Sequence, residues 1–220
     1  MKVAANKIIR SKRRTIALSI SPDATLVVRA PLRVPVSYIE DFIERKSHWI
    51  NQKIQEMLAR PKKSTKNFVD GEEFLFLGHR YQLQISDGRK IILYDKLIFP
   101  ESFLTNPKEK LTTWYKLQAQ ELINKRVQAL AAQMNVKYSS IKIGSATHRW
   151  GSCSASGNLN FTWRLIMAPI EVVDYVIVHE LTHITEKNHS SRFWAKVRTF
   201  APDYKSQHKW LKNNDHLLHI

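Results

Sequence analysis

In the first part of the chain, hydrophobic residues recur at every second position, as in a strand, and then at helical spacing. Ile16, Leu18 and Ile20 alternate with polar or small residues, as in a half-buried β-strand, and residues 26–30 follow as a returning strand. From Ser37 onward the apolar residues fall on one helical stripe: Ile39, Phe42, Ile43, Ile50, Ile54 and Met57. Residues 60–64 (RPKKS) interrupt this pattern, so we expect a linker there.

Strands and one long helix are predicted in the middle of the chain. Residues 74–99 are strand-rich, and Asp87-Gly88 is typical of a hairpin turn. Asn106 and Pro107 are typical of the first positions of a helix. The apolar face of this helix continues to about Met134, so a helix of several turns is expected.

The remaining third of the chain mixes short strands with helices. Residues 138–143 and 158–163 are predicted strands, and they flank a loop of sequence HRWGSC (148–153). Pro169 starts a helix, a further helix begins after Ser190, and Pro202 marks another boundary. This mixture without a regular βαβ alternation indicates an α+β fold.

Length and pattern together predict two domains. We expect a strand-rich basic region with one helix over residues 1–104, and a second domain over residues 105–220. The 220 residues, of which 43% are hydrophobic, suffice for a core without disulfides. No apolar run reaches the roughly 18–20 residues of a membrane span, and the N-terminus lacks the apolar region of a secretory signal. The single cysteine fits a reducing compartment, so the cytoplasm is the expected location.

Positive charge is concentrated at the N-terminus. The chain has 35 Lys and Arg against 19 Asp and Glu, and the first 66 residues hold 15 of the former and only 5 of the latter. Such an excess favours a polyanionic partner, such as a nucleic acid or nucleotide, although a solvated basic surface explains it equally well. The candidate contacts are Lys12, Arg13, Arg14, Arg29 and Arg33.

The strongest chemical signal is the motif HELTH at residues 179–183. Four residues on a helix turn the chain by about 400°, so His179 and His183 leave the same face one turn apart. Two imidazoles in this geometry suit one tetrahedral Zn²⁺. Glu180 lies beside them and can accept a proton from a zinc-bound water. The motif therefore predicts a zinc-dependent hydrolase with Glu180 as general base.

The third metal ligand has two candidates. His189 follows His183 by six residues, so the helix must end near Glu186 and turn back through Lys187 and Asn188. The alternative is Asp203, a carboxylate on a later helix, as in the thermolysin-like arrangement. We favour His189.

The residues around the metal motif resemble those of the YgjP-like metallopeptidases, which are related to the SprT-like zincins. The resemblance rests on HELTH, on Asn188-His189-Ser190 with Phe193-Trp194, and on Arg149 to Cys153 upstream. Weaker similarity extends over most of the chain, and Thr162 departs from the Asn usual in this family. The resemblance implies a zincin-like catalytic domain in residues 105–220, and a zinc held by His179, His183 and His189.

Several other residues are candidates for a catalytic role, with a purely structural role as the alternative. Cys153 is expected to be a packed, inert thiol, because no Cys/His/Asn spacing signals a cysteine hydrolase. Trp150 and Gly151 are candidates for a cleft wall. His148, Arg149, Tyr204 and His208 are candidates for stabilising a tetrahedral intermediate.

Three functions remain open at this point. A peptidase acting on a peptide or protein substrate is the leading hypothesis. A metal-dependent hydrolase of nucleotides or phosphate anhydrides is the second, motivated by the positive charge. The third is a protease that associates with nucleic acid through its basic N-terminal region. The oligomeric state is not predicted.

Overall fold

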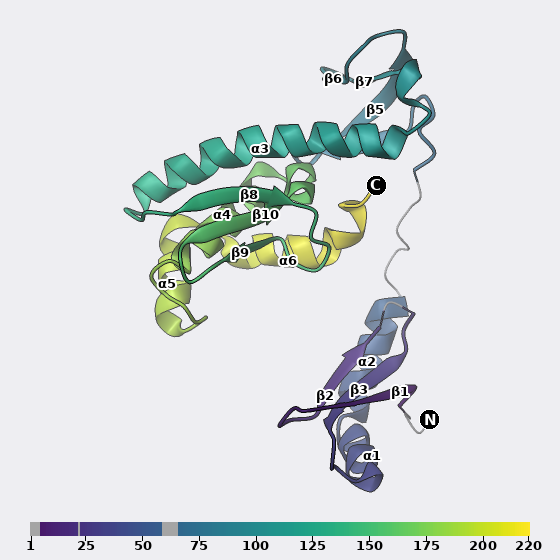
Figure 1. Cartoon of the computed structure of the whole chain (residues 1–220), viewed down its shortest axis with the longest axis vertical. Helices are drawn as coiled ribbons and strands as arrows, with labels where there is room; N and C mark the ends of the chain where they lie inside the picture. Colours follow the sequence, from purple (N-terminus) through teal and green to yellow (C-terminus); the bar gives the residue numbers. More distant parts are fainter. Residues whose placement is uncertain (1–4, 22, 59–65) are drawn as a thin grey trace. The chain divides into compact units, whose positions relative to one another are not determined.

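The computed structural model of the chain describes residues 5–21, 23–58 and 66–220 (Figure 1). The chain divides into two compact units, unit 1 (Met1–Lys62) and unit 2 (Lys63–Ile220). This division differs from the boundary after residue 104 that the sequence pattern predicts. The reason is that Phe74, Leu83 and Phe99 are buried in the same core as Leu111 and Tyr115 of the long helix. The linker predicted at 60–64 lies outside the described residues.

Unit 1 is a three-stranded sheet with two helices packed on one of its faces. Its strands are β1 (Lys7–Ser11), β2 (Ala17–Ile20) and β3 (Leu26–Pro31), in the order β1-β3-β2. β3 pairs with β1 in parallel and with β2 antiparallel. Leu26, Val28 and Ala30 alternate along β3 and are fully buried, so they give the sheet its apolar face. Strand β1, rich in basic residues, was not expected from the pattern.

Two helices complete the core of unit 1. The single helix predicted from residue 37 is divided into α1 (Val36–Arg45) and α2 (Ser47–Leu58), with Lys46 between them. Ile39, Ile43 and Ile50 are buried against β3. The predicted helical stripe therefore faces the sheet, although it runs over two helices.

Unit 2 begins with a four-stranded sheet of order β4-β5-β7-β6. Its strands are β4 (Glu73–Phe76), β5 (His79–Ser86), β6 (Ile92–Leu93) and β7 (Leu97–Pro100). The hairpin predicted at Asp87-Gly88 is wrong, because β5 pairs with β7 in parallel and the β4–β5 hairpin turns at Leu77-Gly78. Both turn residues have positive φ, 48° and 81°, as a tight hairpin requires.

The turn of this hairpin is held by a distant part of the chain. Leu77 N donates to Ile166 O at 2.8 Å, and Gly78 N donates to Met167 O at 3.1 Å. A Cβ at position 78 would lie 2.8 Å from Pro169 Cγ, so only glycine allows this approach. The turn therefore packs on the segment that leads into the helix of the metal motif.

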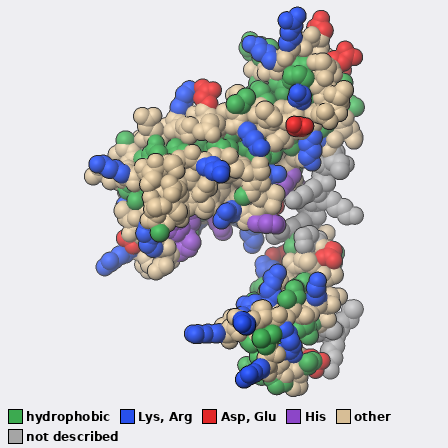
Figure 2. All heavy atoms as spheres, in the orientation of Figure 1, with side chains coloured by type: hydrophobic (Ala, Val, Ile, Leu, Met, Phe, Trp, Pro, Cys, Tyr) green, Lys and Arg blue, Asp and Glu red, His purple; other side chains and the backbone are tan. Residues whose placement is uncertain are grey.

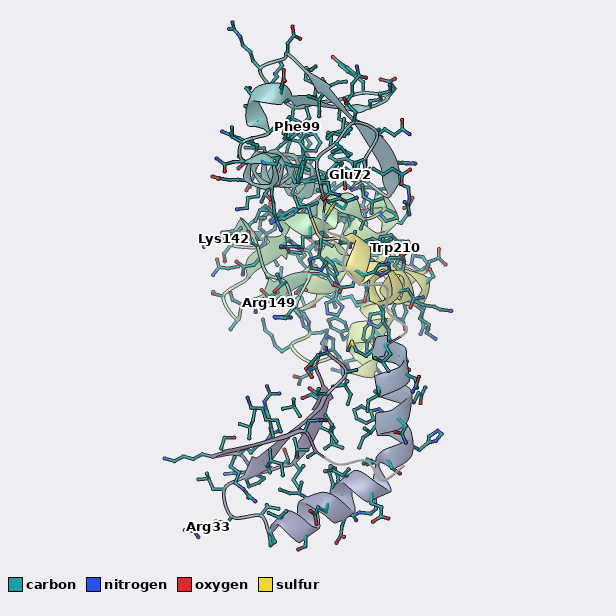
Figure 3. All side chains as sticks on the ribbon, turned by 90° about the vertical axis from the view of Figure 1, so that its right-hand side faces the viewer. Arg33, Glu72, Phe99, Lys142, Arg149 and Trp210 are labelled. Atoms are coloured by element: carbon teal, nitrogen blue, oxygen red, sulfur yellow. The ribbon has the colours of Figure 1, made fainter. Side chains whose placement is uncertain are left out.

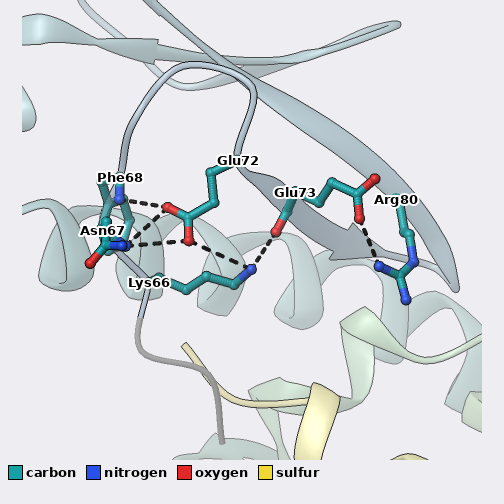
Figure 4. A network of polar contacts seen from close by, with 6 residues as sticks. All are labelled: Lys66, Asn67, Phe68, Glu72, Glu73 and Arg80. Carbon is teal, nitrogen blue, oxygen red and sulfur yellow. Dashed lines mark hydrogen bonds and ion pairs between the residues drawn. The ribbon is translucent and has the colours of Figure 1, made fainter.

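A polar network fixes the first described residues of unit 2 to its sheet (Figure 4). The Glu72 carboxylate accepts hydrogen bonds from the backbone N–H groups of Asn67 and Phe68, at 3.0 and 2.6 Å. Lys66 Nζ donates to Glu73 O at 2.6 Å, and Arg80 pairs with the Glu73 carboxylate at 2.7 Å. Phe68 is thereby held in the core, 5.3 Å from the Phe74 ring.

The long helix α3 (Pro107–Gln133) begins at the predicted Pro107 and ends one residue before the predicted Met134. Its buried face repeats every three to four residues, as the pattern predicts. Two polar contacts tie it to the rest of unit 2. Tyr115 OH donates to Leu75 O at 2.7 Å, and Arg126 forms a bidentate pair with Asp174.

The second sheet of unit 2 has the order β8-β10-β9. It comprises β8 (Ser140–Gly144), β9 (Gly151–Cys153) and β10 (Asn158–Thr162), with β10 parallel to β8 and antiparallel to β9. The two predicted strands are thus present, and the end of the predicted loop between them forms a third. Figure 1 shows α3 running along this sheet.

Three helices follow the second sheet: α4 (Ile170–Thr182), α5 (Ser191–Phe200) and α6 (Tyr204–Asn214). Short 3-10 helices are η1 (Glu101–Phe103), η2 (Trp163–Met167) and η3 (Asp215–Leu217). The helix starts predicted at Pro169 and Ser190 and the boundary at Pro202 are confirmed. The whole chain is an α+β protein, as expected. Among the described residues, no helix is long and apolar enough to cross a membrane.

Candidate metal centre

The HELTH motif lies at the C-terminal end of helix α4, with His183 directly after the last helical residue. Almost every residue from Val172 to Thr182 is buried, which fixes the orientation of the helix. The helix ends at Thr182, and Glu186 N donates to Thr182 O at 2.9 Å in the turn that follows. This turn reverses the chain before α5 begins, where Ser190 Oγ accepts from Phe193 N at 3.4 Å. The local sequence therefore returns His189 towards α4.

Three imidazoles meet at this turn. The nitrogens that His179, His183 and His189 can offer to a metal lie within 4.8 Å of one another. His179 Nε2 and His189 Nε2 are 3.0 Å apart. In a tetrahedral zinc site with Zn–N of 2.0–2.1 Å, two nitrogens are about 3.3 Å apart, so the cluster has the size that one zinc ion needs. Asp203, the rival ligand, is exposed at the start of α6 and is not part of this cluster.

Aromatic side chains of α5 support the three imidazoles. Phe193 is fully buried, and its ring centroid lies 4.9 Å from that of His179 and 4.7 Å from those of His183 and His189. Trp194 stacks on His189 at 5.7 Å. Phe193 and Trp194 thus form the floor of the histidine cluster.

The hydrogen bonds and the burial of the cluster suit a metal. His183 Nδ1 lies 3.1 Å from Glu186 O, which favours the tautomer with Nε2 free to bind a cation. His179 Nδ1 is buried and has no hydrogen-bond partner among the described residues. Burial lowers the pKa of His179 to about 4 and also lowers the pKa of His183. These imidazoles are therefore neutral near pH 7, as metal ligands must be.

Glu180 lies next to the cluster and faces strand β9. Its side chain is buried, with 6% of the residue surface exposed. A Cβ at Gly151 would lie 2.7 Å from Glu180 Oε1 and Cγ, so the backbone of β9 packs directly on the carboxyl group. Burial raises the pKa of Glu180 to about 7, and the nearby positive charge of Arg149 opposes this rise.

A cavity of about 310 Å³ opens beside Glu180. It lies between α4, α6 and the start of β9, so a molecule placed in it contacts both Glu180 and His179 of the histidine cluster. The residues that line it are Trp150, Gly151, Tyr175, Val176, His179, Glu180, His208, Leu211 and Lys212. Trp150 and Gly151 thus lie at the cleft wall for which the sequence made them candidates.

Two polar lining residues, Tyr175 and Lys212, were missed by the sequence analysis. Tyr175 precedes His179 by one helical turn, and Lys212 follows His208 by one turn. Helical spacing from a recognised residue was the signal that could have identified both. Burial raises the pKa of Tyr175 to about 12, so it stays a neutral hydroxyl in the cavity.

The other candidate residues from the sequence analysis lie on β9, on the loop before it and on α6. Cys153 lies on β9, where burial and the charge of Glu180 raise the pKa of its thiol, in keeping with the inert role expected. Tyr204 stacks on Trp194 at 5.1 Å, so it supports the aromatic floor. His208 alone of the α6 candidates lines the cavity. Arg149 and His148 lie on the loop before β9.

Comparison with known proteins identifies one family. The family model for YgjP-like proteins, described as a metallopeptidase domain, matches residues 14–214. The zymogen of the metallopeptidase abylysin from Pyrococcus abyssi is similar in structure over 41% of this chain and 92% of its own, with 18% identity and a TM-score of 0.38. The zymogen of jannalysin from Methanocaldococcus jannaschii is similar over 41% and 91%, with 24% identity and a TM-score of 0.36. A search of curated proteins finds no match.

Proposed function

Because the chain belongs to the YgjP-like metallopeptidases and is therefore a metal-dependent peptidase, we propose that its metal is zinc. The ligands in this proposal are His179, His183 and His189. The observation that supports it is the cluster of three imidazoles packed on Phe193, next to the buried carboxyl group of Glu180. Three nitrogen ligands leave a coordination position open, as a catalytic rather than a structural zinc site requires.

In the proposed mechanism the metal and Glu180 have separate roles. When bound, zinc supplies a Lewis acid that polarises the scissile carbonyl and acidifies the attacking water. Glu180 accepts the proton of that water at its carboxylate and later delivers it to the leaving amine. Its position in the cavity wall beside His179 supports this role, because a substrate in the cavity lies within its reach.

The substrate is a peptide or protein, as the family implies. The family assignment favours the peptide bond over the phosphate anhydride that the sequence alone leaves open. Tyr175 and His208 line the same cavity with hydrogen-bond donors. We propose that they bind the backbone of the substrate. The single cysteine supports a cytoplasmic location as part of the same proposal.

The test of the proposed function is Glu180→Gln. Removing the proton acceptor should lower the rate of peptide hydrolysis by roughly 10²–10⁴-fold while the bound zinc, measured by mass spectrometry, stays near one per chain. The matched control is Glu171→Gln, an exposed carboxylate in the first turn of the same helix, which should keep both. Wild-type turnover in Glu180→Gln would rule out Glu180 as the base.

We also propose that the basic surface of unit 1 binds nucleic acid. Arg29 is exposed between the buried Val28 and Ala30, so it lies on the sheet face opposite to the core. Lys12, Arg14 and Arg33 are exposed as well, whereas Arg13 is half-buried. Figure 2 shows Lys and Arg side chains spread over the visible surface of unit 1. Such a surface supports contacts to phosphates without sequence preference.

A further inference from the structure

A second cavity, of about 280 Å³, borders the catalytic cavity. Trp150 and Gly151 line both cavities, so the two meet at the start of β9, next to Glu180. The second cavity lies over the ends of β8 and β10, and Lys142 and Arg149 also line it. Figure 3 labels both cations at the same edge of unit 2. A substrate in the catalytic cavity therefore has a route to two positive charges.

Two side chains from the end of β10 and from η2 hold the loop that carries Arg149 by hydrogen bonds. Thr162 Oγ1 donates to Ala146 O at 2.9 Å, and Arg164 donates to Ser145 O at 3.1 Å. Arg164 is itself held, with its guanidinium 4.5 Å from the Trp163 ring centroid. The loop is thus supported by Thr162 at the end of β10 and by Arg164 of η2, which fix the backbone that carries Arg149.

Neither cation of the second cavity is paired directly with a carboxylate in the described part of the chain, although the charge of Arg149 acts on nearby Glu180. Lys142 and Arg149 are exposed, and within the described part of the chain they have no hydrogen bond or ion pair. No carboxylate lines this cavity among the described residues. A third, neighbouring cavity is also lined by Arg149, together with Arg164 and the acidic residue Asp215. The positive charges of Lys142 and Arg149 are therefore free to bind an anionic group of a ligand.

We propose that Lys142 and Arg149 form a subsite for a carboxylate of the peptide substrate, so that the enzyme prefers acidic peptides. The proposal rests on the peptidase function above and adds a substrate class to it. A guanidinium binds a carboxylate through two parallel hydrogen bonds, and a lysine adds charge at little geometric cost. The carboxylate is either an Asp or Glu side chain near the scissile bond or the C-terminus of a short substrate, because both carry the same group.

The first test measures binding without turnover. Labelled short peptides are titrated into zinc-loaded Glu180→Gln protein and followed by fluorescence anisotropy. The reference peptide is neutral, with an acetylated N-terminus and an amidated C-terminus. A set of variants places one Glu side chain at each position in turn. A last peptide has neutral side chains and a free C-terminus. The anionic peptides should bind about tenfold more tightly than the neutral one. The peptide that binds more tightly than the neutral one, with a Glu side chain or with a free C-terminus, identifies the source of the carboxylate.

Substitutions then connect the preference to the subsite. Arg149→Gln or Lys142→Gln should reduce the anionic-to-neutral ratio towards one, and Arg149→Glu should favour peptides with Lys over those with Glu. Arg198→Gln is the matched control, since this exposed arginine of α5 lines none of these cavities and should leave the ratio unchanged. A ratio near one in the parent protein, or a ratio that Arg149→Glu does not change, would overturn the proposal.

The same peptides separate this inference from the proposed function. Hydrolysis of the neutral and anionic peptides by the zinc-loaded wild-type enzyme at equal rates would overturn the subsite and leave the peptidase intact. If no peptide is hydrolysed at all, the proposed function fails, while the anisotropy ratio still decides the subsite.

Discussion

At the scale of single residues, the contact between Gly151 and Glu180 shapes the catalytic cleft. The backbone of β9 approaches the carboxyl group so closely that a methyl group at position 151 would overlap Glu180 Cγ and Oε1, both at 2.7 Å. The glycine is therefore required by close approach and not by its backbone angles, because its φ is not in the positive range. It holds Glu180 where it faces the cavity.

Gly151→Ala should displace Glu180 and lower the rate of hydrolysis by about 100-fold, since a misplacement of about 1 Å is enough for such a loss. The zinc content should stay the same, because the three atoms nearest to the new methyl group all belong to Glu180 and not to a histidine of the cluster. Gly88→Ala is the control, as its nearest neighbour is the Ser86 hydroxyl at 3.3 Å on a surface turn. A fully active Gly151→Ala enzyme would show that Glu180 tolerates displacement.

The choice of third ligand is also decided by single residues. His189→Ala should weaken zinc binding by more than about 100-fold, beyond the loss typical of a residue that only supports a ligand. Asp203→Ala should leave zinc affinity unchanged, since Asp203 is exposed and outside the cluster. Competition with a chelator of known affinity measures both. The opposite order would favour the carboxylate arrangement.

At the scale of elements, the position of α4 depends on its neighbours. Pro169 at its start packs on the Gly78 turn, and Asp174 one turn later pairs with Arg126 of α3. At its other end the chain reverses, and α5 places Phe193 under the histidines. The motif helix is thus held at its start, along its length and at its end by three separate segments.

The pair between α3 and α4 is expected to contribute to the stability of unit 2. Arg126 Nε donates to Asp174 Oδ1 at 2.7 Å, and Nη2 donates to Oδ2. A bidentate and partly buried pair should show a coupling of about 1 kcal/mol in the free energy of unfolding. Urea unfolding of Arg126→Gln, Asp174→Asn and the double mutant measures this coupling.

The control for this cycle is the pair of Glu121 and Lys125 on α3, at 2.8 Å with side chains 63% and 71% exposed. Solvent screens such a pair, so its coupling should be smaller than that between Arg126 and Asp174. A coupling between Arg126 and Asp174 no larger than this would mean that the pair does not fasten α4.

At the scale of the whole molecule, the chain combines a small basic unit with a larger unit that carries the histidine cluster. Each unit has its own buried core, Leu26 to Ile50 in unit 1 and Phe68 to Leu218 in unit 2. The surface charge of unit 1 can therefore be altered without changing the packing around the histidine cluster.

If unit 1 binds nucleic acid, its affinity should fall steeply as salt is raised from about 50 mM, because neutralised phosphates release their counterions. Reversing Lys12, Arg14 and Arg29 to Glu should weaken binding to all sequences alike. Zinc content and peptide hydrolysis serve as the control and should not change. Absence of binding at low salt would reduce the basic charge to a solubility feature, and strong binding by the reversed variant would place the contacts elsewhere.

Local patterns in the sequence were enough to predict the parts of the site that lie close together in the chain. Helical spacing alone puts His179, Glu180 and His183 on one helix, because their geometry depends only on 3.6 residues per turn. The extent of α3 and the start of α5 at Ser190 follow in the same way from caps and apolar period. The approach of His189 needs only a short turn after Thr182, so it too was within reach.

Only the tertiary structure decided which distant segments meet. The β4–β5 hairpin turns at Leu77-Gly78 and not at Asp87-Gly88, because the backbone of residues 166–167 binds the first turn and β5 pairs with β7. Strands 73–100 belong with α3 because they share its core, and β9 reaches Glu180 because β10 places it there. Such pairings depend on surface buried between segments far apart in sequence, whereas the helical motif depends on neighbours a few residues away.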